Sequence, residues 1–535
     1  MKNAVRWVIL LVVVGLAAPA FAAELRTTGF IDNVFPHWER NISNPGSDND
    51  TTRNHDQMMV GRTRGRIFFN FIGSDDLRGV FAFELDAIWG LPRRDLAGSG
   101  CIVGDGAYGS GECGFRQNND INNFELKQLY VDFRIPQLPI GNRTQLGGLP
   151  LQATPLHNQL ILTGDFGGGV TRLTFTDQVS LMLYYVQLEE NTETFNNMPL
   201  AGTNTNLGED YYTGATLMLK PLDGLDLHLV GVYGHMQNPF GTELTGNSGP
   251  FHAIQNDATN VTTESRYYLG FDSRYRLGNL SLEPFFVYLL GTRKFCNPGT
   301  TINTNGDARV PCTSPVGSPS STDFNAYVGS FTARYTTGPW LLQAKYAYAS
   351  GNRAGDDINN RGNGKRSDVK GYRPLTTDGS PIWDEWFEIL GRSEVDGNST
   401  QTFRRWAESG TADRFGWQVV AAHPEYQFSD NLVLEGAAGG MWTAGMSTAC
   451  PAVLRSVTTG ACGGPNNSSG QPIYNFTGKS NFLGWEVDVG FRYSIMPGLT
   501  WTPRVGYADY GDAYSANNRT AQGAWTFSNR MIYIF

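Results

Sequence analysis

The sequence predicts an all-β fold: a transmembrane antiparallel up-and-down β-barrel of about 18 strands, with short turns at one end and long loops at the other. Three features of the chain lead to this prediction. Many segments alternate apolar and polar side chains with a period of two, and short and long connections alternate along the chain. In addition, no segment beyond the N-terminal leader has about 18 consecutive apolar residues. We therefore expect any membrane span to be made of strands.

The N-terminal residues have the pattern of a secretory signal peptide. Lys2 and Arg6 form a basic start, an apolar stretch follows, and Ala-Phe-Ala at 20–22 is a small-x-small cleavage site. We expect residues 1–22 to be removed on export. Because two positive charges leave with them, the net charge changes from −9 to −11. This acidic balance argues against a nucleic-acid partner.

Composition favours a single barrel domain over residues 23–535, although the length alone would suggest about three domains. Glycine accounts for 64 of 535 residues and aromatic residues for 12%, yet the mean hydropathy is only −0.31. Such a chain is rich in strand formers without being apolar on average. This is expected when each strand is apolar on one side only.

The candidate strands begin soon after the cleavage site. They lie near residues 25–35, 57–73, 77–89, 124–136, 142–149, 168–177, 179–189, 210–221, 225–236, 265–277, 280–292, 324–336, 339–350, 414–428, 432–443, 481–495, 499–510 and 523–535. In the segment 481–495, Trp485 and Val487 share one side of the strand, whereas Glu486 and Asp488 share the other.

The connections between these strands are of two kinds. Eight are short and made of turn residues: GSDDL, PQLPIG, DQ, PLDGL, GN, TTGP, SDN and MPG. Nine long connections alternate strictly with them. A barrel of 18 antiparallel strands with both chain ends on the short-turn side has this arrangement. A soluble β-sandwich also alternates side chains, but it gives no reason for all the long loops to lie at one end.

The last strand ends in aromatic residues. Trp525, Tyr533 and Phe535 share one side, and Arg530 lies on the other. With its signal peptide, its amphipathic strands and the final Tyr533-x-Phe535, the chain resembles bacterial outer-membrane porins. The resemblance implies an outer-membrane location, periplasmic short turns, extracellular loops and an outer face in contact with lipid. It also implies that Tyr533 and Phe535 are the signal read by the barrel-assembly machinery.

The side of each strand opposite its apolar face supplies candidate pore-lining residues. The basic candidates are Arg62, Arg64, Arg66, Arg134, Arg172, Lys220, Arg274, Arg276, Arg334, Lys345, Arg492, Arg504 and Arg530. The acidic candidates are Glu84, Asp86, Asp132, Asp272, Glu283, Glu435, Glu486 and Asp488. Because basic residues outnumber acidic ones, we expect a lumen with a mild preference for anions.

The segment VGRTRGRIFFNF carries the densest group of these residues. The short turn that follows it should place Arg64 opposite Asp86 and Arg66 opposite Glu84. Cross-strand charge pairing on the barrel wall is one interpretation of this arrangement. A basic ladder that guides an anionic solute is the other.

The longest loop spans about residues 351–413. In its segment SPIWDEWFEILGR, Ser380 is a suitable N-cap for a short helix. The apolar residues that follow have helical spacing: Pro381, Trp383, Trp386, Phe387 and Leu390. An apolar face in an external loop needs a surface to pack on. The barrel mouth, the lumen and a neighbouring subunit are the three candidates, so a homo-oligomer remains open.

The six cysteines fall in three predicted outer loops, as Cys101 with Cys113, Cys296 with Cys312, and Cys450 with Cys462. Six cysteines allow 15 connectivities. In the oxidising compartment to which the signal peptide leads, this distribution favours three local disulfide bonds, one for each loop. A metal site is disfavoured, because no pair has the C-x-x-C spacing.

The patterns favour a porin for passive diffusion of small hydrophilic or anionic solutes, without a cofactor. A catalytic role is disfavoured, since none of the seven histidines lies in a catalytic motif. The segment GSDNDTT at 46–52 could bind Ca²⁺, but a solvated loop is favoured.

The alternative function is the export of an acidic polysaccharide. The segments TQLGGLPLQ and LTGDFGGGVTRLTF resemble barrels of the alginate-export type, which have 18 strands and an arginine-rich lumen. The matching positions are Gly147, Gly148, Asp165, Gly167 and Arg172.

Overall fold

The computed structural model describes residues 24–40, 57–89, 124–157, 161–190, 209–237, 261–295, 301–304, 308–311, 321–352, 368–372, 374–377, 386–390, 416–444, 481–511 and 523–535. The predicted signal peptide, all six cysteines and the segment 46–52 lie outside these residues.

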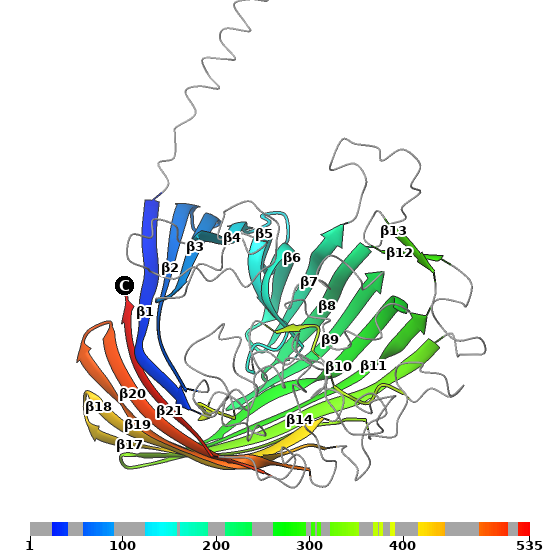
Figure 1. The fold of residues 1–535 in the computed structure, drawn as a ribbon. Helices are drawn as coiled ribbons and strands as arrows, with labels where there is room; N and C mark the ends of the chain where they lie inside the picture. The colour runs from blue at the N-terminus through cyan, green and yellow to red at the C-terminus, as the bar shows by residue number, and fades with distance from the viewer. Residues whose placement is uncertain are drawn as a thin grey trace, which may run out of the picture.

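Eighteen strands form one closed wall (Figure 1). They are β1 (Glu24–Arg40), β2 (Gln57–Ser74), β3 (Leu77–Ile88), β4 (Phe124–Phe133), β5 (Gly141–Gln152), β6 (Leu162–Thr176), β7 (Val179–Glu190), β8 (Glu209–Leu219), β9 (Leu225–Gln237), β10 (Val261–Leu277), β11 (Leu280–Phe295), β14 (Ser321–Thr337), β15 (Trp340–Ala349), β17 (Trp417–Ser429), β18 (Leu432–Trp442), β19 (Phe482–Met496), β20 (Leu499–Tyr510) and β21 (Ala524–Ile534). Each pairs antiparallel with the wall strands before and after it in the chain. The predicted fold class is therefore confirmed.

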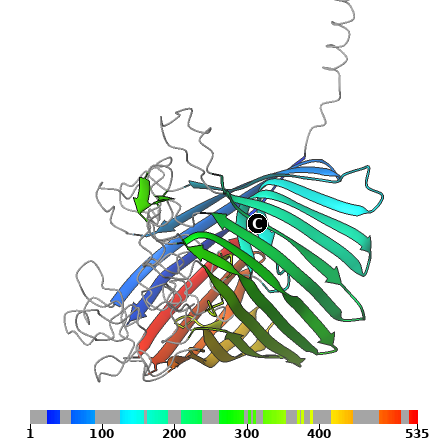
Figure 2. The same ribbon diagram turned by 90° about the vertical axis from the view of Figure 1, so that its right-hand side faces the viewer.

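The wall closes where the first strand meets the last. β1 pairs with β2 on one side and with β21 on the other, and Phe30 lies opposite Ile534 in that second pairing. Beyond the end of β21, the backbone groups of Gly29 and Phe535 exchange two hydrogen bonds of 3.0 Å. The terminal phenylalanine therefore belongs to the seam that closes the barrel, and all strands run oblique to the barrel axis (Figure 2).

All eight predicted short connections link consecutive wall strands, and they lie at the end of the barrel that also holds both strand termini of the seam. Gly278, Gly338 and Gly498 occupy three of these turns with φ values of 57°, 54° and 81°. Side chains with a Cβ rarely adopt this region of φ, which explains the glycine in these tight turns.

Three short strands were not expected from the sequence. β12 (Thr301–Thr304) and β13 (Ala308–Pro311) pair with each other in a two-stranded sheet. β16 (Thr376–Thr377) belongs to the long connection between β15 and β17, and it pairs parallel with Leu162 and Thr163 of β6. Part of the long loop 351–413 thus reaches a strand on a different side of the barrel.

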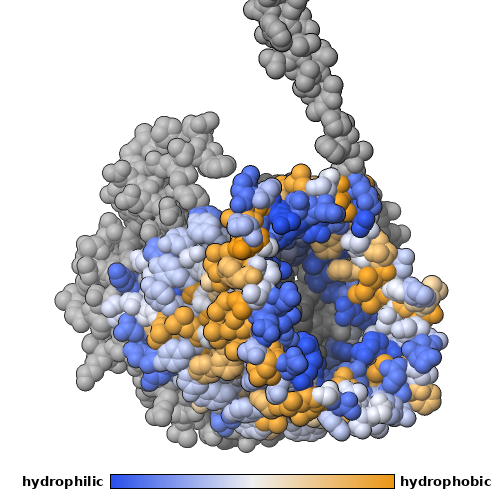
Figure 3. Space-filling view, turned by 180° about the vertical axis from the view of Figure 1, so that it is seen from behind, coloured by the Kyte–Doolittle hydropathy of each residue, from blue (hydrophilic) through white to orange (hydrophobic). Residues whose placement is uncertain are grey.

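The two sides of the wall differ in polarity as the alternation predicts. On β19, Trp485, Val487 and Val489 expose 39%, 42% and 59% of their surface, whereas Glu486 and Asp488 expose 0% and 4%. Figure 3 shows an opening whose rim carries hydrophilic residues, with hydrophobic residues on the outer surface. A closed barrel with an apolar outer face is built to span a bilayer, because lipid offers no partner for backbone groups.

No helix in the described part of the chain is long and apolar enough to cross a membrane.

The interior is not polar throughout, although the alternation of side chains predicted a polar lumen. Val230 and Val232 of β9, Val287 of β11, and Ala326 and Val328 of β14 have inward side chains with 4% exposure or less. They belong to one cluster of buried apolar residues. This part of the inner wall is covered by segments that fold into the barrel, so it does not face water.

We expect an arginine on the outer face of β19 to destabilise the barrel. Val489→Arg places a charge against hydrocarbon and should lower the free energy of unfolding by about 2–4 kcal/mol if the site lies near the bilayer midplane. Urea unfolding in lipid vesicles measures this. Asn70→Arg on β2, where the side chain faces the lumen, is the control and should cost much less; equal losses would contradict the assigned sidedness.

Candidate functional site: the barrel interior

A first inner segment, residues 153–157 with 161, follows β5 and turns into the barrel. The carbonyl of Ala153 accepts a 2.9 Å hydrogen bond from the hydroxyl of Thr216 on β8. The carboxylate of Asp272 on β10 accepts hydrogen bonds from the backbone N–H groups of Leu156 and His157, at 2.8 and 3.2 Å. It also contacts Nδ1 of His157. A wall carboxylate therefore fixes the tip of this segment.

A second inner segment, residues 368–372 with 374–377, comes from the long loop. Val369 bonds to the backbone of β14 through its N–H and its carbonyl, at 2.8 and 2.9 Å. Farther along, the N–H of Leu375 donates a 2.7 Å hydrogen bond to the carbonyl of Ile161 in the first inner segment. Burial raises the pKa of the Tyr372 phenol well above its ordinary value, so that this side chain stays neutral. The two inner segments are thus joined inside the barrel.

A third inner segment, residues 386–390, lies against the opposite wall. The N–H groups of Glu388 and Ile389 donate hydrogen bonds of 2.9 and 2.7 Å to Oε1 of Glu486 on β19, and the N–H of Leu390 donates to Oε2. The ring of Trp386 stacks on His423 of β17, with centroids 5.4 Å apart. All five residues of the segment are buried.

The sequence left three locations open for this loop, and residues 386–390 lie against the inner wall. Residues 381–385 of the predicted helix lie outside the described residues; Trp386 has 3₁₀ conformation and residues 388–390 form a turn. Three consecutive N–H groups point at one carboxylate. A wall residue distant in sequence thus fixes the local conformation.

Two wall glycines make room for the inner segments. A Cβ on Gly234 of β9 would lie 2.8 Å from Cδ2 of Leu375, and a Cβ on Gly439 of β18 would lie 2.6 Å from Cζ of Phe387. Real Cβ contacts are essentially never this close, so a larger residue would displace the apolar side chain. The wall and the loop are complementary at both places.

Charged side chains of the wall follow a repeated arrangement, in which one buried carboxylate lies between two cations. The six sets are Asp32 with Arg62 and Arg530, Glu84 with Arg66 and Lys127, Asp132 with Arg78 and Arg143, Glu264 with Arg266 and Arg293, Glu283 with Arg274 and Arg334, and Glu435 with Arg492 and Arg504. The carboxylates expose 2–4% of their side chains, whereas Arg66, Arg78 and Arg530 expose 23%, 36% and 32%. Arg62, Arg266 and Arg293 are as buried as the carboxylates, so every set except that of Glu264 presents at least one cation to the lumen.

The balance of charge differs across the barrel. The wall from β21 through β1 to β6, here called the basic sector, has these described inward cations: Arg62, Arg64, Arg66, Arg78, Lys127, Arg143, Arg172 and Arg530. Its described inward carboxylates are Asp32, Glu84, Glu125, Asp132 and Asp165, where Glu125 lies directly opposite Glu84. On the wall from β17 to β20, here called the acidic sector, the carboxylates outnumber the arginines. Glu425, Glu435, Glu486 and Asp488 face Arg492 and Arg504 there, together with Glu388 of the third inner segment.

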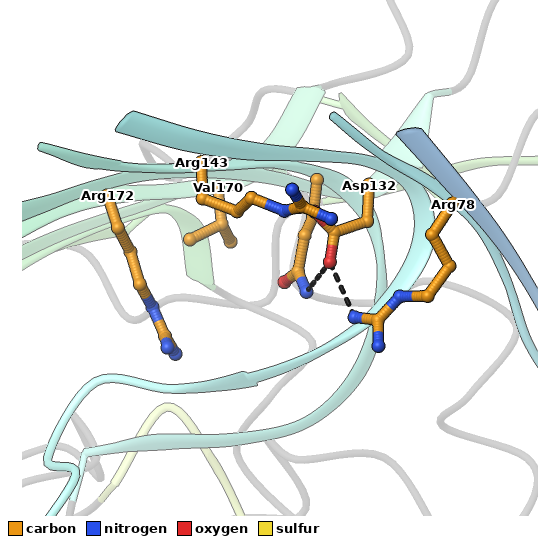
Figure 4. Close-up of a pocket in the computed structure, with 6 residues that line it drawn as sticks. Arg78, Asp132, Arg143, Val170 and Arg172 are labelled. Carbon is orange, nitrogen blue, oxygen red and sulfur yellow. Dashed lines mark hydrogen bonds and ion pairs between the residues drawn. The ribbon is translucent and has the colours of Figure 1, made fainter. Parts of the chain in front are cut away.

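The basic sector contains a cavity of about 330 Å³ near the short-turn end (Figure 4). It is lined by Arg78, Asp132, Arg143, Gln145, Val170 and Arg172. Arg78 and Arg143 both contact Asp132, whereas Arg172 makes no hydrogen bond or ion pair within the described part of the chain. The cavity therefore holds three guanidinium groups and one carboxylate.

The sequence-predicted residues fall into three groups. The register confirms that Arg64 lies opposite Asp86 and Arg66 opposite Glu84, although the side chain of Asp86 lies outside the description. Most of the other predicted arginines take part in the shared-carboxylate sets. Arg134 and Arg276 instead lie exposed at the short-turn end, with Asp76 and Asp226 at 3.9 and 3.2 Å.

Sequence reasoning missed several inward cations. Arg78, Arg143 and Arg266 share the phase of inward neighbours, so a stricter use of the alternation would have found them. Lys127 is different, because the register of β3 and β4 shifts between its neighbours: Ala82 pairs with Gln128, but Phe83 pairs with Leu126. A bulge of this kind moves a side chain to the other face and leaves no sign in the alternation.

Among the described residues, no group of three or more His, Cys, Asp or Glu side chains is arranged to hold a metal ion.

No protein-family model matches the chain, and no curated protein matches it. Similar solved structures include three proteins of Pseudomonas aeruginosa. OccK8 (OprE) is 11% identical with a TM-score of 0.45, covering 96% of this chain and 98% of that chain. The outer membrane protein OprD is 10% identical with a TM-score of 0.42, covering 97% and 96%. OpdK, solved with vanillate, is 10% identical with a TM-score of 0.44, covering 96% and 98%. Since these TM-scores lie below 0.5, the interior is interpreted from its own geometry.

We expect Asp32→Ala to destabilise the barrel strongly. The carboxylate of Asp32 contacts Arg62 of β2 at 2.6 Å and Arg530 of β21 at 2.8 Å, and the Arg62 side chain is only 4% exposed. Removing one partner of a buried ion pair typically costs about 3–5 kcal/mol. Urea unfolding in vesicles measures the loss. Glu24→Ala, which removes an exposed pair with Arg26 on the same strand, should leave the stability unchanged; similar effects of both variants would contradict this account.

Proposed function

We propose that the protein is an outer-membrane channel for passive diffusion of small hydrophilic solutes, with a mild preference for anions. The observation that carries this proposal is the position of the inner segments. Their contacts in the described residues fall on β6, β8 to β11, β14, β15 and β17 to β20. No such contact falls on β21 or on β1 to β4, the larger part of the basic sector, within the described residues.

The chemistry of the basic sector supports anion preference. The carboxylates of Asp32, Glu84 and Asp132 are buried and shared between cations, and Arg66, Arg78 and Arg530 expose their guanidinium groups to a solute. Guanidinium groups bind carboxylates and phosphates with paired N–H donors. The field is moderate, since each pair of cations is half neutralised by its shared carboxylate. A weak bias is therefore the expected outcome, and strict selectivity is not.

The inner segments limit the size of the solute. The first and second are hydrogen-bonded to each other, and the third lies against the opposite wall, so that folded chain occupies the lumen from two sides. Figure 1 shows β16 of the second segment inside the ring of wall strands. A lumen narrowed in this way suits small solutes better than a polymer.

Uptake of neutral sugars separates diffusion from polysaccharide export. Liposomes containing the purified protein should swell in isotonic solutions of small sugars, at rates that fall steeply with sugar size. Protein-free liposomes are the control. Failure to pass the smallest sugars would contradict passive diffusion and would favour the exporter.

Charge reversal at Arg172 tests the anion preference. In planar bilayers under a salt gradient, the reversal potential of the wild-type protein should indicate preference for anions. Arg172→Glu should reduce that preference, because Arg172 is exposed in the basic cavity and has no ion-pair partner among the described residues. Arg172→Lys keeps the charge and should keep the selectivity. A cation preference of the wild-type channel would overturn the proposal.

A further inference from the structure

We propose that Glu486 is a positioning residue that holds the third inner segment in the lumen, and that acid opens the channel by neutralising it. The inference rests on the proposed channel function. Glu486 is fully buried, and its carboxylate accepts hydrogen bonds from the backbone N–H groups of residues 388, 389 and 390. A single side chain of the wall thereby satisfies three consecutive donors of the loop.

Further contacts also hold this segment against the wall. Oε1 of Glu388 accepts a hydrogen bond of 3.0 Å from Arg504 of β20. Nζ of Lys345 on β15 lies 4.4 Å above the ring of Trp386, on which His423 also stacks. Phe387 packs against the wall at Gly439. Both hydrogen-bonded tethers, at Glu486 and at Glu388, depend on an ionised carboxylate.

The charges around Glu486 make its ionisation sensitive to acid. The titratable and charged groups that face it or the segment it holds are Asp488 on the same strand, Glu388 of the loop, Glu435 of β18, Arg504 of β20, His423 of β17 and Lys345 of β15. The side chain of Asp488 lies in hydrogen-bond contact with that of Glu486, and no N–H or O–H group of the described residues donates to its carboxylate oxygens. Acidic groups thus outnumber arginines at this place, which is the reverse of the basic sector.

The hydrogen bonds from residues 388–390 to Glu486, here called the latch, weaken when the Glu486 carboxylate is protonated. A carboxylate offers two negatively charged oxygens, and hydrogen bonds to an ionised group are roughly twice as strong as those between neutral groups. Once Glu486 is neutral, one of its oxygens carries the proton and the three N–H groups lose their anionic partner. Neutral Glu388 also loses its ion pair with Arg504. The segment is then released from the wall, and the lumen widens.

Single-channel conductance as a function of pH tests this device. For the wild-type protein we expect conductance to increase between neutral and acid pH. Glu486→Gln, which has nearly the shape of the neutral side chain, should at neutral pH already show the conductance that the wild type reaches in acid, and its pH dependence should be flat. A variant with wild-type conductance and an unchanged acid response would overturn the proposal.

Two further variants separate the latch from its surroundings. Glu84→Gln removes an equally buried carboxylate from the basic sector, without contact to an inner segment among the described residues, and should keep the acid-induced increase. Glu388→Gln weakens only the second tether, lies outside the strands, and should raise neutral-pH conductance less than Glu486→Gln does. If Glu84→Gln also abolishes the acid response, the effect belongs to the lumen as a whole and the latch is wrong. A wild-type protein without any conductance would instead refute the channel function.

Discussion

The constraint on which the rest of the structure depends is that a chain inside hydrocarbon must satisfy its backbone hydrogen bonds by itself. For strands this requires closure, and closure here depends on the pairing of β1 with β21. The final residue takes part through its backbone, since Phe535 and Gly29 exchange hydrogen bonds. The buried Asp32 of β1 connects β1 to β2 through Arg62 and to β21 through Arg530. Backbone pairing and a shared carboxylate thus stabilise one seam.

Closure also determines how charge can be placed inside. A wall strand presents every second side chain to the lumen, so neighbouring strands bring charged residues side by side whether or not a solute is present. A carboxylate between two cations lowers their mutual repulsion and remains buried beneath them, as at Asp132 and Glu283. The two interpretations of the arginine-rich segment are therefore not exclusive. Cross-strand pairing fixes the positions of the arginines, and the excess of cations makes the electrostatic potential of the lumen positive.

The barrel could be predicted from the sequence because its signals are local: period-two alternation, and turn residues such as Gly278 and Gly338. What could not be predicted depends on contacts between distant residues. The path of the long loop is fixed by Glu486 and by Ile161, and neither is close to it in sequence. The inward face of β9 is apolar at Val230 and Val232, which alternation alone assigns to lipid or to a core without distinction. The bulge at Lys127 reverses the facing of one cation without a sequence signal.

The inner segments cover both the apolar part of the inner wall and the acidic sector. An apolar inner wall between β8 and β14 would be unfavourable in a hydrated lumen, and an acidic sector with few arginines would repel itself. The chain resolves both problems with the same long loop, whose Leu375 covers the apolar wall and whose backbone N–H groups at 388–390 approach the acidic one. In the basic sector, Asp32, Glu84 and Asp132 are instead each shared between two cations of the wall. The described parts of the loop therefore lie against the walls that require them.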